Sequence, residues 1–191
     1  MKRAIIIHCW EGYPEYCWYP WVKNELAARG FRVEVPAFPD PAGPRMEAWL
    51  ARLREAAGEP DEELYLIGHS LGCATIMRYL ETLAAGEKTG GAVFVAGFDE
   101  DMGYEPMRNF FVKPFDWEKI KAGSQHGFVA IHSDDDPFVD LRYAEVFRAR
   151  LGAAVIVKHG AKHFSAAVQG EAACRRLPEL IQSIEGLYDH G

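Results

Sequence analysis

The sequence predicts an α/β protein with a mostly parallel sheet of about six strands and helices on both faces, in a three-layer αβα arrangement. Short apolar runs alternate with segments of helical periodicity along the chain, a pattern typical of βα units around a parallel sheet. The chain has 191 residues and is 49% hydrophobic, which is enough to bury one core. We therefore expect a single domain over residues 1–191.

The expected elements follow from the apolar pattern. The predicted strands are Ala4–Ile7, Arg32–Val35, Leu64–Ile67, Ala92–Val95, Phe128–Ile131 and Ala154–Val157. Apolar side chains recur at helical spacing over Trp18–Leu26, Met46–Leu53, Cys73–Ala85 and Leu177–Ile184. Each such helix presents one apolar stripe to the sheet.

Composition excludes several classes of function. The formal net charge is −7, and no Lys or Arg cluster indicates a nucleic-acid partner. The apolar run at the N-terminus is too short for a signal peptide, and no run approaches the roughly 20 residues that span a bilayer. We expect a soluble, cytoplasmic protein. The four cysteines contain no CxxC pair, so we expect free thiols and neither a disulfide scaffold nor a zinc site.

The stretch LYLIGHSLGC at 64–73 carries the main chemical signal. Ser70 lies between Gly68 and Gly72, where a buried strand turns sharply into a helix. Small residues on either side allow the strained turn that exposes a serine hydroxyl at the edge of the sheet. The same turn places the backbone N–H of Leu71 at a helix N-terminus, where it can bind an oxyanion. The alternative is a serine that only caps the helix, but the strand and helix around it favour a nucleophile. His69 is expected to point away from the attack face and to be structural.

An activated serine needs a base and an acid from later loops at the same sheet edge. The loop HSDDDPFVD at 132–140 offers four aspartates, and KHGAKHFS at 158–165 offers two histidines. His163 is favoured as the base, because His159 lies almost within the preceding strand. The acid is one of four aspartates in the other loop: Asp134, Asp135, Asp136 and Asp140. His159 and His163 are four positions apart, a spacing that suits a metal on a helix, but Gly160 disfavours a helix there and no HExxH is present. The aspartates lack regular calcium-ligand spacing. Metal-dependent hydrolysis stays open as an alternative. We expect no metal and no cofactor.

The motifs together resemble the α/β-hydrolase superfamily, and within it the small serine hydrolases similar to retinoblastoma-binding protein nine and its bacterial relatives. The resemblance rests on IIIHCWEGYPEYCWYPWV, GHSLGC, FVKPFDWEKIKA, HSDDDPFV and KHF. It implies a minimal, lidless hydrolase fold. It also implies that the acid is the aspartate before the proline, Asp136, and that the base is the histidine before a phenylalanine, His163.

The same resemblance implies a second oxyanion donor in the loop after the first strand. An H-G-x setting is usual there, but this chain reads His8, Cys9, Trp10. The backbone N–H of Trp10 becomes the expected donor, and the Cys9 side chain is expected to narrow the pocket. The L-x-C-x-E segment that links the vertebrate relative to its retinoblastoma-type partner lacks its glutamate here, because position 75 is Thr75. That binding function is not expected.

The stretch 97–125 breaks the alternating pattern, with no clean period and many aromatics. Loops this long are usually functional or mobile, so we expect it near the active site. Its aromatics, Phe110, Phe111, Phe115 and Trp117, either wall a substrate pocket or pin the segment to the core.

The expected reaction is acyl transfer from a small carboxylic ester to water, through Ser70, His163 and Asp136. Amide, peptide, thioester and lactone hydrolysis stay open as alternatives, because the same serine chemistry serves all of them. A hydrolase fold kept only for protein binding, with the triad idle, is an alternative of a different class.

Overall fold

The computed structural model describes residues 1–189 and builds one six-stranded sheet. The strands are β1 (Arg3–Ile7), β2 (Arg32–Glu34), β3 (Leu64–His69), β4 (Gly91–Val95), β5 (Phe128–Ser133) and β6 (Ala154–Lys158). Their order is β2-β1-β3-β4-β5-β6, and every adjacent pair is parallel. The sequence predicted all six strands to within two residues at each end, and the sheet is wholly parallel.

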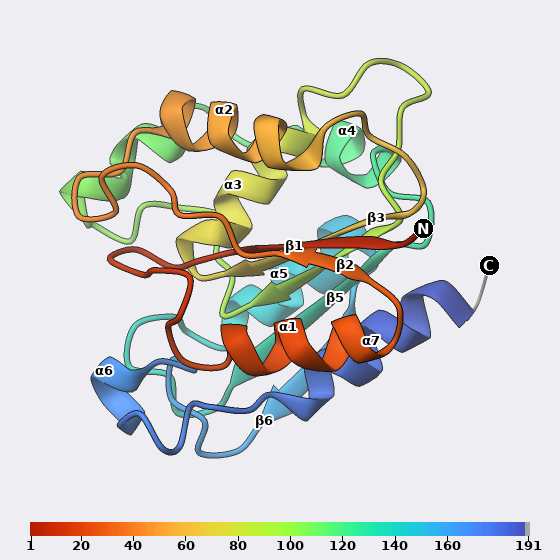
Figure 1. The fold of residues 1–191 in the computed structure, drawn as a ribbon. Helices are drawn as coiled ribbons and strands as arrows, with labels where there is room; N and C mark the ends of the chain where they lie inside the picture. The colour runs from red at the N-terminus through yellow and green to blue at the C-terminus, as the bar shows by residue number, and fades with distance from the viewer. Residues whose placement is uncertain (190–191) are drawn as a thin grey trace.

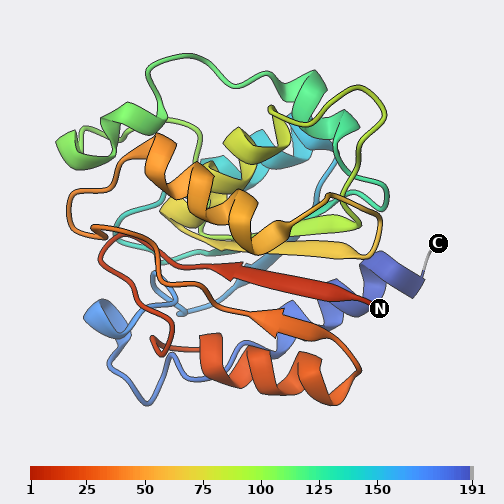
Figure 2. The same ribbon diagram turned by 45° about the horizontal axis from the view of Figure 1, so that its top comes forward.

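Helices cover both faces of the sheet, as Figures 1 and 2 show. On one face lie α1 (Tyr19–Ala28) and α7 (Pro178–Asp189). The opposite face carries α2 (Met46–Ala57), α3 (Leu71–Leu80), α4 (Trp117–Ala122) and α5 (Arg142–Leu151). Two buried clusters follow from this arrangement, one around Trp49 and Phe94 and the other around Trp18 and Tyr65. The three-layer prediction is confirmed.

The segment 97–125 is more regular than the sequence suggested. It contains a 3-10 helix, η1 (Glu105–Phe110), and α4, whose first turn is capped by the Asp116 carboxylate accepting from the Lys119 amide at 3.1 Å. Each has only six residues, which is too short for an apolar period to emerge.

Arg78 of α3 anchors the segment 97–125 to the core. Its side chain is only 3% exposed and forms a 2.8 Å ion pair with Glu81. The guanidinium also donates to the carbonyls of Phe110 and Lys113. Glu81 in turn accepts from the Asp116 amide at 2.7 Å. A buried pair that also satisfies backbone groups holds an otherwise irregular chain in one place.

The carboxyl ends of the parallel strands meet at one edge of the sheet. Loops leave this edge after β1, β3, β5 and β6, and the short helix α6 (Ala166–Gln169) lies beside them. In Figure 1 the N-terminus lies at the opposite end of β1. In residues 1–189, none of the helices has both the length and the apolar character that crossing a bilayer requires.

Candidate active site

Ser70 occupies the sharp turn between β3 and α3. Its backbone φ is +54° and ψ is −118°, a conformation that costs free energy for a residue with a side chain. A Cβ at Gly68 would lie 2.7 Å from the amide nitrogen of Cys73, and one at Gly72 would lie 2.3 Å from the carbonyl oxygen of Ile7. Both positions therefore require glycine. The Ser70 amide donates to the carbonyl of Val95 at 2.8 Å, which fastens the turn to β4.

Three predicted residues meet at this turn in one hydrogen-bonded chain. His163 Nε2 lies 3.0 Å from Ser70 Oγ, and His163 Nδ1 lies 2.8 Å from Asp136 Oδ2. The side chains of His163 and Asp136 are 10% and 1% exposed. A carboxylate only accepts hydrogen bonds, so Nδ1 carries the proton and the Nε2 lone pair faces the serine hydroxyl.

Contacts within their own loops fix the orientation of the Asp136 and His163 side chains. Asp136 Oδ1 accepts from the amides of Phe138 at 2.9 Å and Val139 at 3.1 Å, which leaves Oδ2 for the imidazole. The Phe138 ring packs edge-on against His163, with centroids 5.2 Å apart. His163 lies between Lys162 and Phe164, which have φ of +48° and +55°, so this short turn is also strained.

The other candidates in the two loops have different partners. Asp134 is hydrogen-bonded to His159, whose side chain is 90% exposed. Asp135 accepts from the Lys162 amide at 2.8 Å and pairs with its ammonium group. Asp140 accepts from the Arg142 amide at the start of α5. None of these four side chains is in the hydrogen-bonded chain that ends on Ser70.

His69 is hydrogen-bonded to the backbone of the loop that carries His163. Its Nε2 lies 2.8 Å from the carbonyl oxygen of His163, and its Nδ1 lies 2.7 Å from the Tyr19 hydroxyl. Burial lowers the pKa of His69 to about 3, so the ring is neutral. Nε2 must therefore donate to the carbonyl, and Nδ1 accepts from Tyr19. The Tyr19 oxygen accepts from the Cys9 amide at 3.1 Å.

This chain of bonds has a structural consequence. It connects the loop after β1, which carries Cys9, to the turn that carries His163. His69 points away from the Ser70 hydroxyl, as the sequence predicted. No local pattern indicated that Tyr19 and His69 act together, since they are 50 positions apart.

The two amides expected to bind an oxyanion belong to Leu71 and Trp10. Leu71 is the first residue of α3, and the first amides of a helix have no intrahelical acceptor. Trp10 lines the pocket that contains Ser70. The amides on either side of Trp10 already donate hydrogen bonds: the Cys9 amide donates to the Tyr19 hydroxyl, and the Glu11 amide donates to the carbonyl of Pro41. Burial raises the pKa of the Cys9 thiol to about 11, so this side chain is neutral.

Ser70 and His163 open into a pocket of about 290 Å³. Its wall is apolar and aromatic, formed by Trp10, Tyr16, Met102, Tyr104, Met107 and Phe138. Cys9 also lines it, as the sequence predicted. Three of these wall residues come from the 97–125 segment, which therefore does lie over the site.

Phe110, Phe111 and Trp117 do not line this pocket, which corrects their assignment as substrate-binding candidates and favours the alternative that they pin the segment to the core. Phe110 is buried against Trp49, and Phe111 packs on Phe98 and Phe115. Trp117 packs on Phe115 and Phe147. These rings pin the segment to the core, whereas the pocket is lined by its less conspicuous residues Met102, Tyr104 and Met107. Periodicity could not distinguish the two sets, because the segment has none.

Within residues 1–189, no group of three or more His, Cys, Asp or Glu side chains is arranged to hold a metal ion.

A parallel sheet with a strained serine at a strand-to-helix turn defines the α/β-hydrolase fold, and solved structures of that fold match this chain. The crystal structure of the ydeN gene product of Bacillus subtilis superimposes with a TM-score of 0.91 at 28% identity, covering 99% of this chain and 100% of that one. A carboxylesterase structure from Nitrososphaera gargenis shares the fold with a TM-score of 0.71 at 13% identity, over 98% of this chain and 90% of that one.

Residues 4–180 match the model of the Serine hydrolase family. YdeN of Bacillus subtilis strain 168 is 34% identical over 165 residues, which are 85% of this chain and 86% of YdeN. Serine hydrolase RBBP9 of Rattus norvegicus is 34% identical over 139 residues, 71% of this chain and 72% of that protein. The chain belongs to the serine hydrolase family, so the predicted resemblance is confirmed.

Proposed function

We propose that this protein hydrolyses small, uncharged carboxylic esters by acyl transfer through Ser70, with His163 as the base and Asp136 as the acid. One observation carries the proposal: a continuous chain of hydrogen bonds runs from Asp136 through His163 to Ser70, and it ends at an apolar pocket of about 290 Å³. Membership of the serine hydrolase family supports the same reaction class.

The first half of the reaction acylates the serine. His163 Nε2 accepts the proton of Ser70 Oγ as the oxygen attacks the ester carbonyl carbon. The resulting imidazolium is stabilised by the Asp136 carboxylate, which stays ionised. His163 then donates the proton to the alcohol oxygen, the C–O bond breaks, and an acyl-serine remains.

The second half returns the enzyme to its starting state. Water enters, His163 accepts one of its protons, and the hydroxide attacks the acyl carbon. The C–O bond to Ser70 breaks as His163 returns the proton to Oγ. In both halves we assign the amides of Leu71 and Trp10 to the oxyanion. Removing one such donor from a serine hydrolase costs about 10²–10³-fold in rate.

Pocket chemistry suggests the class of ester. The described lining residues include one carboxylate, Glu11, and neither Lys nor Arg. An anionic acyl group would approach that carboxylate without a compensating cation, whereas an uncharged acyl chain would contact the apolar wall. The volume suits a small substrate.

The test is a matched substrate series assayed on the full chain. p-Nitrophenyl esters with neutral acyl chains of two to eight carbons, a succinyl ester and a p-nitroanilide of the best acyl group are compared by kcat/KM. We expect a maximum among the short neutral chains, at least about tenfold above the succinyl ester. A higher kcat/KM for the anilide would replace the ester by an amide. Turnover that persists in Ser70→Ala would overturn the proposal.

A further inference from the structure

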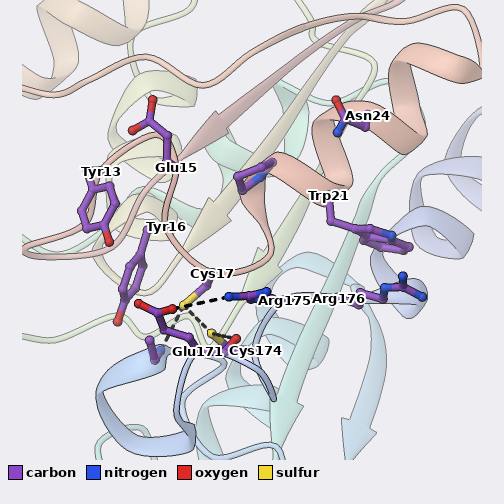
Figure 3. A pocket seen from close by; sticks show the side chains of 12 residues that line it. Tyr13, Glu15, Tyr16, Cys17, Trp21, Asn24, Glu171, Cys174, Arg175 and Arg176 are labelled. Carbon is purple, nitrogen blue, oxygen red and sulfur yellow. Dashed lines mark hydrogen bonds and ion pairs between the residues drawn. The ribbon is translucent and has the colours of Figure 1, made fainter.

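Two of the four cysteines lie sulfur to sulfur outside the site described above. The Sγ atoms of Cys17 and Cys174 are 2.8 Å apart, although 157 positions separate them in the chain. Cys17 lies in the loop that precedes α1, and Cys174 lies between α6 and α7. Figure 3 shows the two sulfurs facing each other. Cys73 is buried in the core cluster around Trp49, and Cys9 is buried at the active-site pocket.

A surface pocket gives access to this pair. The pocket has a volume of about 490 Å³, and both Cys17 and Cys174 line it. Tyr16 and Arg175 stand beside them (Figure 3). Cys17 is partly exposed and Cys174 is buried directly behind it, so a small solute can reach the Cys17 sulfur without unfolding of the core.

The same residues connect this pocket to the wall of the active-site pocket. The amide of Ala166 donates to Cys17 Sγ at 3.0 Å, and the amide of Ala167 donates to the Tyr16 hydroxyl at 3.3 Å. Tyr16 and Ala167 line the pocket that contains Ser70 and His163. Anything that restrains Cys17 against Cys174 therefore restrains one wall of that pocket.

We propose that Cys17 and Cys174 are an oxidative modification site, at which a peroxide forms a reversible disulfide that links the segment after α6 to the loop before α1. The sulfurs need to approach by less than about 1 Å, since a disulfide bond is about 2.05 Å long. Because burial raises the pKa of the Cys17 thiol, the reaction is expected to be slow near neutral pH and faster in alkaline solution.

The step balances with hydrogen peroxide as the oxidant. One thiolate attacks a peroxide oxygen, the O–O bond breaks, and a sulfenic acid and hydroxide form. The second sulfur attacks the sulfenic sulfur, the S–S bond forms, and the S–O bond breaks to release water. Two thiols and one peroxide give one disulfide and two waters. The two sulfurs together lose two electrons.

A mass-spectrometric experiment tests the bond itself. The native, purified full chain is treated with hydrogen peroxide, alkylated, and digested without reduction by a glutamate-specific protease. Cleavage after Glu11 and Glu15 separates Cys9 from Cys17. We expect a cross-linked peptide pair that contains Cys17 and Cys174 and disappears after dithiothreitol. Sulfinic or sulfonic acids at these positions without a disulfide, or cross-links through Cys9 or Cys73, would overturn the proposal.

Amide hydrogen exchange tests the link to the pocket wall. In the oxidised protein, the amides of Ala166 and Ala167 should exchange at least about tenfold more slowly, because a cross-link suppresses local opening. Cys174→Ser and Cys174→Ala cannot form the bond, so peroxide should leave their exchange unchanged. Equal exchange in the oxidised and reduced protein would contradict the link. Neither readout uses a substrate, so both are independent of the proposed hydrolase activity.

Discussion

Two Asp–His pairs join the same two loops, and their environments differ completely. Asp136 and His163 are buried, with side chains 1% and 10% exposed. The other imidazole nitrogen, His163 Nε2, is hydrogen-bonded to Ser70 Oγ. Asp134 and His159 are hydrogen-bonded as well, yet His159 is 90% exposed. The hydrogen bond between carboxylate and imidazole is therefore not what defines the site. Burial, fixed orientation and contact with Ser70 do.

The largest effect is expected from removing the buried imidazole. His163→Ala leaves Ser70 without a proton acceptor, and kcat should fall by about 10⁵-fold or more, as in other serine hydrolases whose triad acts as a unit. The measurement is kcat on the best p-nitrophenyl ester. Circular dichroism verifies that the variant is folded, and a fall below about tenfold would mean that another group is the base.

The next effect concerns the buried carboxylate. Asp136→Asn keeps the shape but offers an amide donor toward His163 Nδ1, which favours the tautomer with Nε2 protonated. We expect kcat to fall by about 10³–10⁴-fold. Asp134→Asn is the matched control in the exposed pair, and it should retain kcat within about twofold. Equal losses in the two variants would remove the distinction between the pairs.

A third histidine, His69, is hydrogen-bonded to no carboxylate, and we expect its protonation to affect the stability of the protein. Its ordinary pKa of 6.5 is lowered by burial to about 3. Between these pH values the unfolded chain binds a proton that the folded protein excludes, so the free energy of unfolding falls as the pH falls. Above pH 6.5 His69 is neutral in both states, and its titration does not change the free energy of unfolding. Between pH 6.5 and pH 3 that free energy decreases by about 1.4 kcal/mol per pH unit.

Urea unfolding of wild type and His69→Gln at several pH values between 6.5 and 4 measures this effect. The stability difference between them should shrink by about 1.4 kcal/mol per unit as the pH falls, because only the wild type takes up this proton on unfolding. Glutamine retains a donor and an acceptor for His163 and Tyr19. Parallel pH profiles for the two proteins would show that His69 has the same pKa in the folded and unfolded states, which would contradict this prediction.

The smallest effect belongs to the exposed imidazole. His159→Ala removes an interaction that water and salt already screen, so kcat/KM should stay within about twofold of wild type. The fluorescence of the folded protein and the urea midpoint should also change little. A loss above about tenfold would transfer the role of base from the buried pair to the exposed one.

The fold was largely predictable because its signals are local. Each strand is a short apolar run, and the turn at Ser70 needs small residues on both sides, which the sequence displays directly as Gly68 and Gly72. The choice between His159 and His163 was harder. Both follow β6 and both have an aspartate within reach, so position only favoured His163. Resemblance to a family pointed to the buried pair that the structure places against Ser70.

The pocket wall was not predictable, because long-range packing decides it. Phe110 and Trp117 look like substrate contacts in the sequence, yet they are needed to anchor a segment that Arg78 also holds. Met102 and Tyr104, from the same segment, are among the residues that line the pocket. The Tyr19–His69 bond likewise joins residues from different elements, and no local pattern marks it.

Labelling with a fluorophosphonate probe tests the central claim most directly, because the probe reacts only with a serine activated by its base. Wild type and His159→Ala should each incorporate one probe per chain, mapped to Ser70, while Ser70→Ala and His163→Ala should remain unlabelled on the same timescale. A folded wild-type protein that takes up no probe would favour an idle hydrolase fold. Loss of labelling in His159→Ala would contradict the assignment of the buried pair.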